Sequence, residues 1–255
     1  MGGETNSLSI WIASCFLLSL RVAPVFLFAP PFTLTRVPKL FLWLFGLGIA
    51  ATLVGAFPDT ARVADLKTST LVIGASREFA LGLVPVIALQ LMFGALYMVG
   101  RTIDIQSGFG LALLIDPTTR GQTPLVGTIF AYLAGIAFFA IDGHHEILRF
   151  MAASLEAVPV GGARGGPSLT AMTSYIFSIF LMAFGVGAAA IVALFLVDLS
   201  VAMLSRTVPQ LNALLLGIQV KALLILFALP VAVALSGALL TQMATAALRA
   251  MARLV

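Results

Sequence analysis

Six long apolar stretches, separated by short polar segments, make up most of this sequence. Of its 255 residues, 61% are hydrophobic and only 9% are charged, whereas a soluble domain carries roughly 25% charged residues. A helix that crosses a bilayer needs about 20 consecutive apolar residues. The pattern therefore predicts an all-α integral membrane protein with about six long, partly broken hydrophobic helices, at about 8–28, 40–57, 71–99, 125–141, 171–204 and 211–245.

The positive charge of the chain is scattered. The net charge is +4, but the basic residues stand singly between apolar stretches and form no patch, so no nucleic-acid partner is expected. Cationic flanks of membrane helices account for this charge. The single cysteine, Cys15, lies inside an apolar stretch, and we interpret it as a small hydrophobic side chain. The first seven residues contain Glu4 and no basic residue, so the first stretch is predicted to be retained rather than cleaved as a secretory signal.

The segment 100–124 is neither a polar loop nor a membrane span. Its apolar and glycine-containing core, 108–115, is too short to cross a bilayer as a helix. Irregular backbone at membrane depth is tolerated only where it is buried in protein or lines a cavity. We therefore expect this segment to have a special position in the molecule.

A polar string at 142–150 comes close to a zinc-protease motif but does not match it. That motif needs a second histidine four residues after the first, and the position after His145 is occupied by Arg149. The only other histidine, His144, is adjacent, and adjacent side chains point about 100° apart on a helix. A helix start capped by Asp142, with Glu146 in the first turn, explains the string more simply.

No catalytic residue, metal ligand or cofactor is therefore expected, and no nucleophile and base are paired in the sequence. A membrane-embedded enzyme that uses Asp142, His144, His145 and Glu146 remains only a third possibility.

Five charged residues lie within or at the ends of the apolar stretches. A charge at membrane depth costs a few kcal/mol on insertion scales, so each should face protein or water. They could form an ion pathway, but pairing between helices is favoured because the acidic residues are far apart in sequence. Asp198 and Arg206 are eight residues apart and can share a helix face. The five residues are Arg21, Glu78, Asp198, Arg206 and Lys221.

Four strings, in order, carry a resemblance to a known family. They are RVAPVFLFAPPFTLTRVPK at 21–39, REFALGL at 77–83 leading into GRTIDIQSGFGLALLIDP at 100–117, DGHHEIL at 142–148, and DLSVAMLSRTVPQLNALLLGIQVK at 198–221. With these strings the chain resembles the FliR family, the R component of the flagellar type III export gate, and more distantly its injectisome counterpart, the T component. The Asp-Gly-His-His string and a Pro-Gln-x-Asn core at Pro209, Gln210 and Asn212 favour the flagellar type.

The resemblance implies a place in a larger assembly. It implies one R subunit with five P and four Q subunits and the flagellar B export switch protein, in the bacterial inner membrane and flagellar basal body. The gate would pass unfolded flagellar proteins. The chain, 1–255, would be a single subunit with a P-like portion at about 1–165 and a Q-like portion at about 166–255. In such a gate the apolar helices would pack largely against partner subunits.

The resemblance also aligns about 105–123 with a plug loop that closes the pore. Glycines would let the chain fold back, apolar side chains would exclude water, and the charged residues Asp104, Asp116 and Arg120 would anchor the ends. The candidate plug residues are Gln106, Gly108, Phe109, Gly110, Leu111, Leu113 and Leu114.

A secondary transporter for a small solute is the alternative. Such transporters use discontinuous helices around a site at mid-membrane, and the broken segment at 100–124 could supply one. Against this interpretation, the two halves of the chain have no matching interruption.

Overall fold

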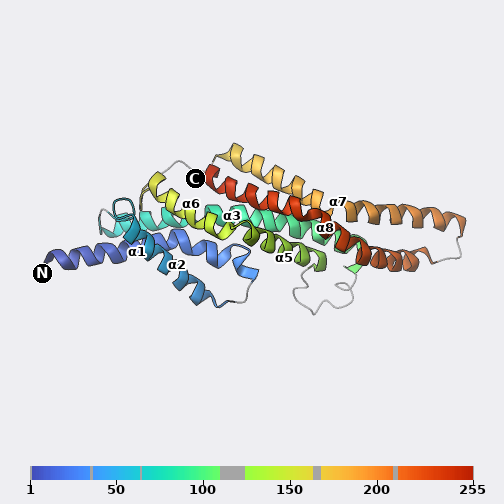
Figure 1. Cartoon of the computed structure of the whole chain (residues 1–255), viewed down its shortest axis with the longest axis horizontal. Coiled ribbons are helices and arrows are strands. Elements are labelled where there is room, and N and C mark those ends of the chain that lie inside the picture. The colour runs from blue at the N-terminus through green and yellow to red at the C-terminus, as the bar shows by residue number, and fades with distance from the viewer. Residues whose placement is uncertain are drawn as a thin grey trace. The chain divides into compact units, whose positions relative to one another are not determined.

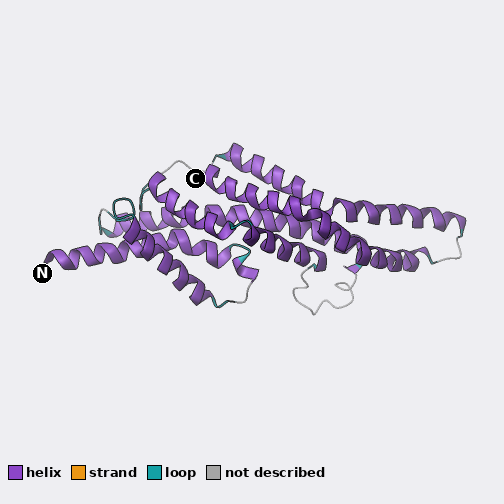
Figure 2. Ribbon diagram, in the orientation of Figure 1, coloured by secondary structure: helices purple, strands orange, loops and turns teal. Residues whose placement is uncertain are grey.

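The computed structural model describes residues 2–34, 37–63, 65–109, 124–162, 168–208 and 212–254. Within these residues the chain is helical and has no strand (Figures 1 and 2). The predicted all-α class is confirmed. The helices are α1 (Gly2–Phe28), the short 3-10 helix η1 (Phe32–Leu34), α2 (Lys39–Ala56), α3 (Thr68–Ser107), α5 (Leu125–Ala140), α6 (Gly143–Ala157), α7 (Leu169–Thr207) and α8 (Ala213–Leu254).

The helices match the predicted apolar stretches closely, with one informative difference. The segment from Gly100 to Ser107 was expected to be broken, but it continues α3 without interruption. The polar residues at 101–107 do not stop the helix, because no proline or glycine lies among them. The helix ends where Gly108 takes a positive φ of 89°, a conformation that glycine adopts at little cost.

Five of the described helices are long and apolar enough to cross a membrane: α1, α2, α3, α7 and α8. The number rises to six if α5 and α6 are counted together as one bent span. Proline lies inside α1, α3 and α8, at Pro24, Pro85 and Pro230, which membrane helices tolerate better than soluble ones. The predicted fold of an integral membrane protein with about six apolar helices is therefore confirmed.

The chain divides into two compact units, and some helices contribute to both. Unit 1 comprises Met1–Leu91, Phe138–Tyr175 and Thr245–Val255, and unit 2 comprises Met92–Ala137 and Ile176–Ala244. In unit 1, α1 packs against α2 (Figure 1). The core of unit 1 is formed by fully buried aliphatic side chains that include Leu18, Val22, Val25, Val54, Leu89, Ile147 and Leu155.

In unit 2, glycines bring helices into direct backbone contact. A Cβ atom added to Gly100 of α3 would overlap the backbone of Gly127 in α5. Small residues of this kind let membrane helices approach closely. Around this crossing the core of unit 2 contains Leu96, Val99, Ile103, Val126, Phe130, Ala134, Ile179, Ala183 and Leu194.

Candidate functional site

A buried ion pair lies at the centre of unit 1. Arg21 of α1 and Glu78 of α3 are 1% and 0% exposed. The Nε atom of Arg21 donates to Oε2 of Glu78 at 2.6 Å, and Nη2 donates to Oε1 at 2.9 Å. Such a two-pronged contact is the strongest geometry for an arginine and a carboxylate. The structure thus brings together two of the five charges that the sequence places at membrane depth.

The remaining donors of Arg21 hold the end of α6. Nη1 donates to the carbonyl and the hydroxyl of Ser154, each at 3.1 Å, and Nη2 donates to the carbonyl of Val158 at 3.0 Å. Oε1 of Glu78 also accepts the backbone N–H of Gly161 at 2.9 Å. We call these five residues the Arg21 clamp. A buried charge pair is tolerated only when its remaining hydrogen-bonding groups are satisfied in this way.

The turn after α6 has further anchors within unit 1. Arg77 donates from Nη1 to the carbonyl of Gly161 at 3.1 Å, and the N–H of Val160 donates to the carbonyl of Thr60 at 2.9 Å. Gly161 has a positive φ of 76°. The turn is therefore held by α3 and by the connection between α2 and α3, although its glycine-rich sequence suggests flexibility.

A glycine makes room for the clamp. A Cβ atom added to Gly82 of α3 would lie 2.6 Å from the carbonyl oxygen of Arg21 and 2.8 Å from that of Leu20. The two helices therefore pack backbone to backbone one turn after Glu78. The REFALGL string thus supplies both the acidic partner and the space that the clamp needs.

At the other end of α3, a carboxylate caps the next described helix in unit 2. Both carboxylate oxygens of Asp104 accept the N–H of Val126, at 3.3 and 3.2 Å. A carboxylate at a helix N-terminus is favoured by the free N–H groups and by the helix dipole. Asp104 therefore connects the end of α3 to the start of α5, and the predicted plug lies between these two helices in the sequence.

Only part of the predicted plug falls within the described residues. Phe109 is 38% exposed, and the side-chain oxygen of Gln106 is buried without a hydrogen-bond partner among the described residues. Gly108 provides the turn at the end of α3. The other plug candidates (Gly110, Leu111, Leu113 and Leu114) and the anchors Asp116 and Arg120 lie outside the described residues.

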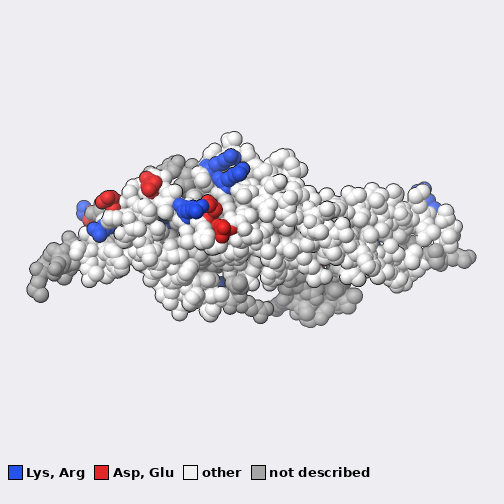
Figure 3. Space-filling view, viewed as in Figure 1, with Lys and Arg blue, Asp and Glu red and all other residues white. Residues whose placement is uncertain are grey.

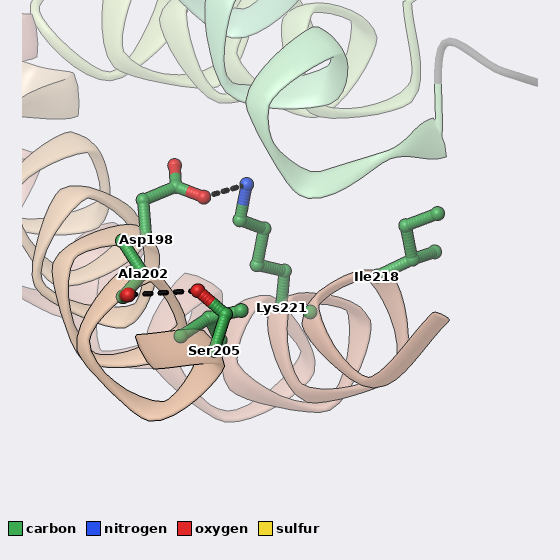
Figure 4. Close-up of a pocket in the computed structure, with 7 residues that line it drawn as sticks. Asp198, Ala202, Ser205, Ile218 and Lys221 are labelled. Carbon is green, nitrogen blue, oxygen red and sulfur yellow. Dashed lines mark hydrogen bonds and ion pairs between the residues drawn. The ribbon is translucent and has the colours of Figure 1, made fainter. Parts of the chain in front are cut away.

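The remaining charged candidates lie on α7 and α8, within unit 2. Lys221 of α8 forms an ion pair with Asp198 of α7 (Figure 4). This pair borders an open groove of about 320 Å³ whose other lining residues are Val201, Ala202, Ser205, Gly217 and Ile218. Asp198 is about half exposed, at 51%, and Lys221 is 17% exposed. The partner of Asp198 in this chain is therefore Lys221, and Arg206 is an exposed residue in the last turn of α7.

The Pro-Gln-x-Asn core falls at the connection between α7 and α8. Oδ1 of Asn212 accepts the N–H of Leu215 at 3.3 Å, the standard bond of a helix cap. Asn212 therefore starts α8. Pro209 and Gln210 lie outside the described residues.

Asp142 does not cap α6 as the sequence predicted. It stands immediately before the helix, but its φ of 57° and ψ of 32° are left-handed, and its side chain makes no capping hydrogen bond. A capping side chain requires an extended backbone at that position. The carboxylate of Asp142 lies instead beside His145, with Oδ1 3.3 Å from Nδ1.

Sequence reasoning missed the partners of Arg21 in α6. Ser154 and the carbonyl of Val158 carry no charge, and they lie 133 and 137 residues after Arg21 in the chain. The one signal that could have led to them was that Arg21 has more donors than a single carboxylate can accept.

Large apolar side chains cover the outside of α7 and α8. In α7, Phe177, Phe195 and Met203 are 72%, 63% and 65% exposed, and in α8, Phe227 and Leu235 are 72% and 70% exposed. The space-filling view shows a surface made mostly of uncharged residues, with charged side chains in a few separate places (Figure 3). Exposed apolar area of this extent marks contact with lipid or with other proteins.

Comparison with known proteins identifies the family. The family described as "Bacterial export proteins, family 1" matches residues 12–247. The Flagellar biosynthetic protein FliR of Bacillus subtilis (strain 168) is 28% identical over 220 residues, which cover 85% of this chain and 84% of the relative. The Surface presentation of antigens protein SpaR of Shigella flexneri is 26% identical over 219 residues, 81% of this chain and 80% of the relative.

The Yop proteins translocation protein T of Yersinia pestis is also similar, at 28% identity over 162 residues, 62% of this chain and 60% of the relative. The match to the family covers the Arg21 clamp, the end of α3, the ion pair between α7 and α8, and Asn212. This chain is therefore a member of the FliR family of bacterial export proteins.

Proposed function

We propose that this chain is the R subunit of a flagellar type III export gate, which helps to form the pore for unfolded flagellar proteins. The observation that carries the proposal is the resemblance to FliR over 85% of the chain. The similarity to the Yersinia translocation protein covers a smaller part, 62% of the chain. SpaR of Shigella flexneri covers 81% of the chain, so the flagellar assignment rests on the two sequence motifs that favour it and not on coverage.

The proposed partners are the P and Q subunits, five and four to one R subunit, together with the flagellar B export switch protein. The unequal burial of the helices supports a role within an assembly. In the most apolar 18-residue segment of each helix, the chain itself buries 61% of α1 but only 33% of α7, 22% of α8 and 17% of α2. Partner subunits would cover the exposed apolar surfaces of α7 and α8, and the proposed place is the inner membrane at the flagellar basal body.

The proposal also divides the chain into two portions, each of which resembles a different partner subunit. Residues at about 1–165 would act as the P-like portion and residues at about 166–255 as the Q-like portion. The Arg21 clamp lies wholly within the first portion, and the Asp198–Lys221 pair lies wholly within the second. Among the described residues, each portion would therefore carry one ion pair that joins two of its helices.

The proposed seal of the pore is the segment at about 105–123. The residues on either side of this segment support the role, because Asp104 at the end of α3 accepts a hydrogen bond from Val126 at the start of α5. A chain segment held at both ends in this way can fill a pore without leaving it. Glycines and leucines in the sequence of the segment would let it fit closely around a moving polypeptide.

The alternative of a secondary transporter is not supported, since the family and the relatives are export and translocation proteins. The relatives are named as a flagellar biosynthetic protein and a translocation protein, and neither name is that of an enzyme. An enzymatic activity is not part of the proposal.

Co-purification tests the proposed assembly. The full chain, carrying an affinity tag and expressed from its own chromosomal locus, should bring down two further small hydrophobic subunits in one large complex. A strain without the gene should be non-motile, and the gene should restore motility. A chain that purifies alone or as a dimer, with motility unaffected by its loss, would overturn the proposal.

Ion leakage tests the proposed plug. Deleting residues 108–115 should make cells that express the complex permeable to small ions, measured as the rate of membrane depolarisation. The matched control is Ser200→Ala, an exposed position on α7, which should leave permeability unchanged. Equal permeability of the deletion and the control, with the complex assembled in both, would exclude a plug in this segment.

A further inference from the structure

The two histidines of the chain and one aspartate meet at the start of α6. Asp142, His144 and His145 each offer a ligand atom, and these atoms all lie within 4.8 Å of one another. The two imidazole rings have their centroids 4.0 Å apart, although adjacent residues on a regular helix would point apart. Both histidines lie in the first turn of α6, directly after the left-handed Asp142.

The backbone of Asp142 is left-handed, a conformation that few residue types other than glycine, asparagine and aspartate adopt. At this position it removes the carboxylate from its usual capping role and leaves it next to His145. Asp142 is therefore the residue that supplies the anionic oxygen of the cluster.

His144 has a buried ring nitrogen that is not used. Its Nδ1 atom is buried and has no hydrogen-bond partner among the described residues. The ring packs against Phe139, with centroids 5.5 Å apart, and this contact limits how the ring can turn. A buried polar atom without a partner is unfavourable, so a ligand that binds this nitrogen would remove that cost.

We propose that Asp142, His144 and His145 form a binding site for a divalent transition-metal ion of the zinc class. Two imidazole nitrogens and one carboxylate oxygen are a ligand set that Zn²⁺ prefers. Ligand atoms at about 2.0–2.1 Å from a tetrahedral ion lie about 3.3 Å apart. The Asp142 and His145 atoms already have that separation, and these two exposed side chains can turn toward the partly buried ring of His144.

The site is one for binding rather than catalysis. The zinc-protease arrangement needs a free glutamate on the helix, but Glu146 is paired with Arg149, with Nη1 2.5 Å from Oε1. Three protein ligands leave one position of the ion for water or for a group from a neighbouring subunit. The ion would join the turn before α6 to the first turn of that helix. The expectation from sequence that the chain has no metal ligand is revised in this respect.

The helix dipole opposes the ion. A helix N-terminus carries about +0.5 of an elementary charge, which disfavours a cation at this place. The Asp142 carboxylate offsets this effect, so binding is expected in the micromolar range rather than at the affinities of buried structural zinc sites.

Titration of the full chain with Zn²⁺ and Co²⁺ tests the site. The chain is purified in detergent with an affinity tag that contains no histidine and is freed of metal with a chelator. Calorimetry should show one Zn²⁺ per chain, and Co²⁺ should give the visible absorption of a site with nitrogen ligands. Since loss of an outer-shell partner alone lowers metal affinity 10–100-fold, His144→Ala and His145→Ala should each lower it at least about tenfold.

The control is Glu156→Gln, an acidic position exposed on the same helix, which should leave the affinity unchanged. Asp142→Asn and His145→Gln serve as milder variants if a replacement by alanine unfolds the chain, with helix content checked by circular dichroism. Absence of binding by the folded wild-type chain would overturn the proposal. So would equal binding by the folded His144 and His145 variants.

Discussion

Two ion pairs join different helices in the described part of this molecule, and they differ in how completely the chain encloses them. Arg21 and Glu78 in unit 1 are 1% and 0% exposed, and their hydrogen-bonding atoms are shared with three other residues of the same chain. Lys221 and Asp198 in unit 2 form a simple pair, and Asp198 is half exposed beside an open groove. The first pair is satisfied within the chain, whereas the second can still interact with something outside it.

This difference indicates that the two pairs contribute differently to the stability of the chain and to its contacts with other molecules. A fully enclosed pair stabilises only the fold in which its partners meet, and breaking it is costly. An exposed pair contributes little to folding but can be rearranged when another molecule approaches. The Arg21–Glu78 pair therefore contributes to the fold of unit 1, whereas the Lys221–Asp198 pair stays accessible at the groove in unit 2.

The strongest test of the contrast is removal of one member of the enclosed pair. Arg21→Met should destabilise the chain by about 3–5 kcal/mol, because it leaves Glu78 charged and buried without a partner. Denaturant unfolding in detergent, followed by circular dichroism, measures the effect. The double variant Arg21→Met/Glu78→Met should lose less stability than the two single variants added together. A loss below about 1 kcal/mol for the single variant would contradict the enclosed pair.

The close helix contact beside the clamp gives the next largest effect. Gly82→Ala should cost about 1–3 kcal/mol, because its methyl group would meet the carbonyls of Leu20 and Arg21. Gly94→Ala is the control, since nothing lies within 4 Å of a Cβ at that position. Alanine favours a helix by up to about 1 kcal/mol over glycine, so the control should be unchanged or more stable. Equal losses for both variants would argue against backbone contact at Gly82.

Replacing a buried neutral polar side chain should also lower the free energy of unfolding more than replacing an exposed one, although by less than for the ion pairs. Ser14 in unit 1 is fully buried, and its hydroxyl oxygen accepts the N–H of Val63 at 3.0 Å. Ser14→Ala should cost about 1–2 kcal/mol, because a buried N–H loses its acceptor. Ser200→Ala, at an exposed position on α7, should change unfolding by less than about 0.5 kcal/mol. The comparison fails if Ser200 proves the more sensitive of the two.

Removal of the exposed pair should have the smallest effect on folding. Lys221→Met should change the free energy of unfolding of the isolated chain by less than about 1 kcal/mol, since Asp198 can be solvated. If the pair serves a partner, the same variant should still reduce recovery of the assembled complex in co-purification. A loss of stability close to that of Arg21→Met would show that the two pairs are not different in kind.

The sequence predicts the helices well because their information is local. Apolar stretches of about 20 residues require helices in a membrane, and the prolines and glycines between them mark most of the ends. The prediction was wrong where it relied on composition alone. Polar residues after Gly100 suggested a break, but α3 continues to Ser107 because those residues still allow a helix.

The site was only partly predictable, because its contacts join distant parts of the chain. Arg21 and Glu78 were recognised as charges that need partners, but they are 57 positions apart and nothing in the sequence between them indicates that they pair with each other. Asp142 illustrates a second limit. Its residue type favours a cap, and only the backbone shows that its carboxylate belongs with the histidines.

The Arg21 clamp can form only after all of its residues have been synthesised. Ser154 follows Arg21 by 133 residues, and at about 5–20 residues per second the ribosome completes it about 7 to 27 seconds later. Glu78 emerges earlier, after 57 residues, or about 3 to 11 seconds at the same rate. Until then the first helix holds an unpaired guanidinium, which costs about 2.5–3.5 kcal/mol at the centre of a membrane. The bonds that satisfy Arg21 in the finished fold therefore form only after the third helix and the end of α6 have been synthesised.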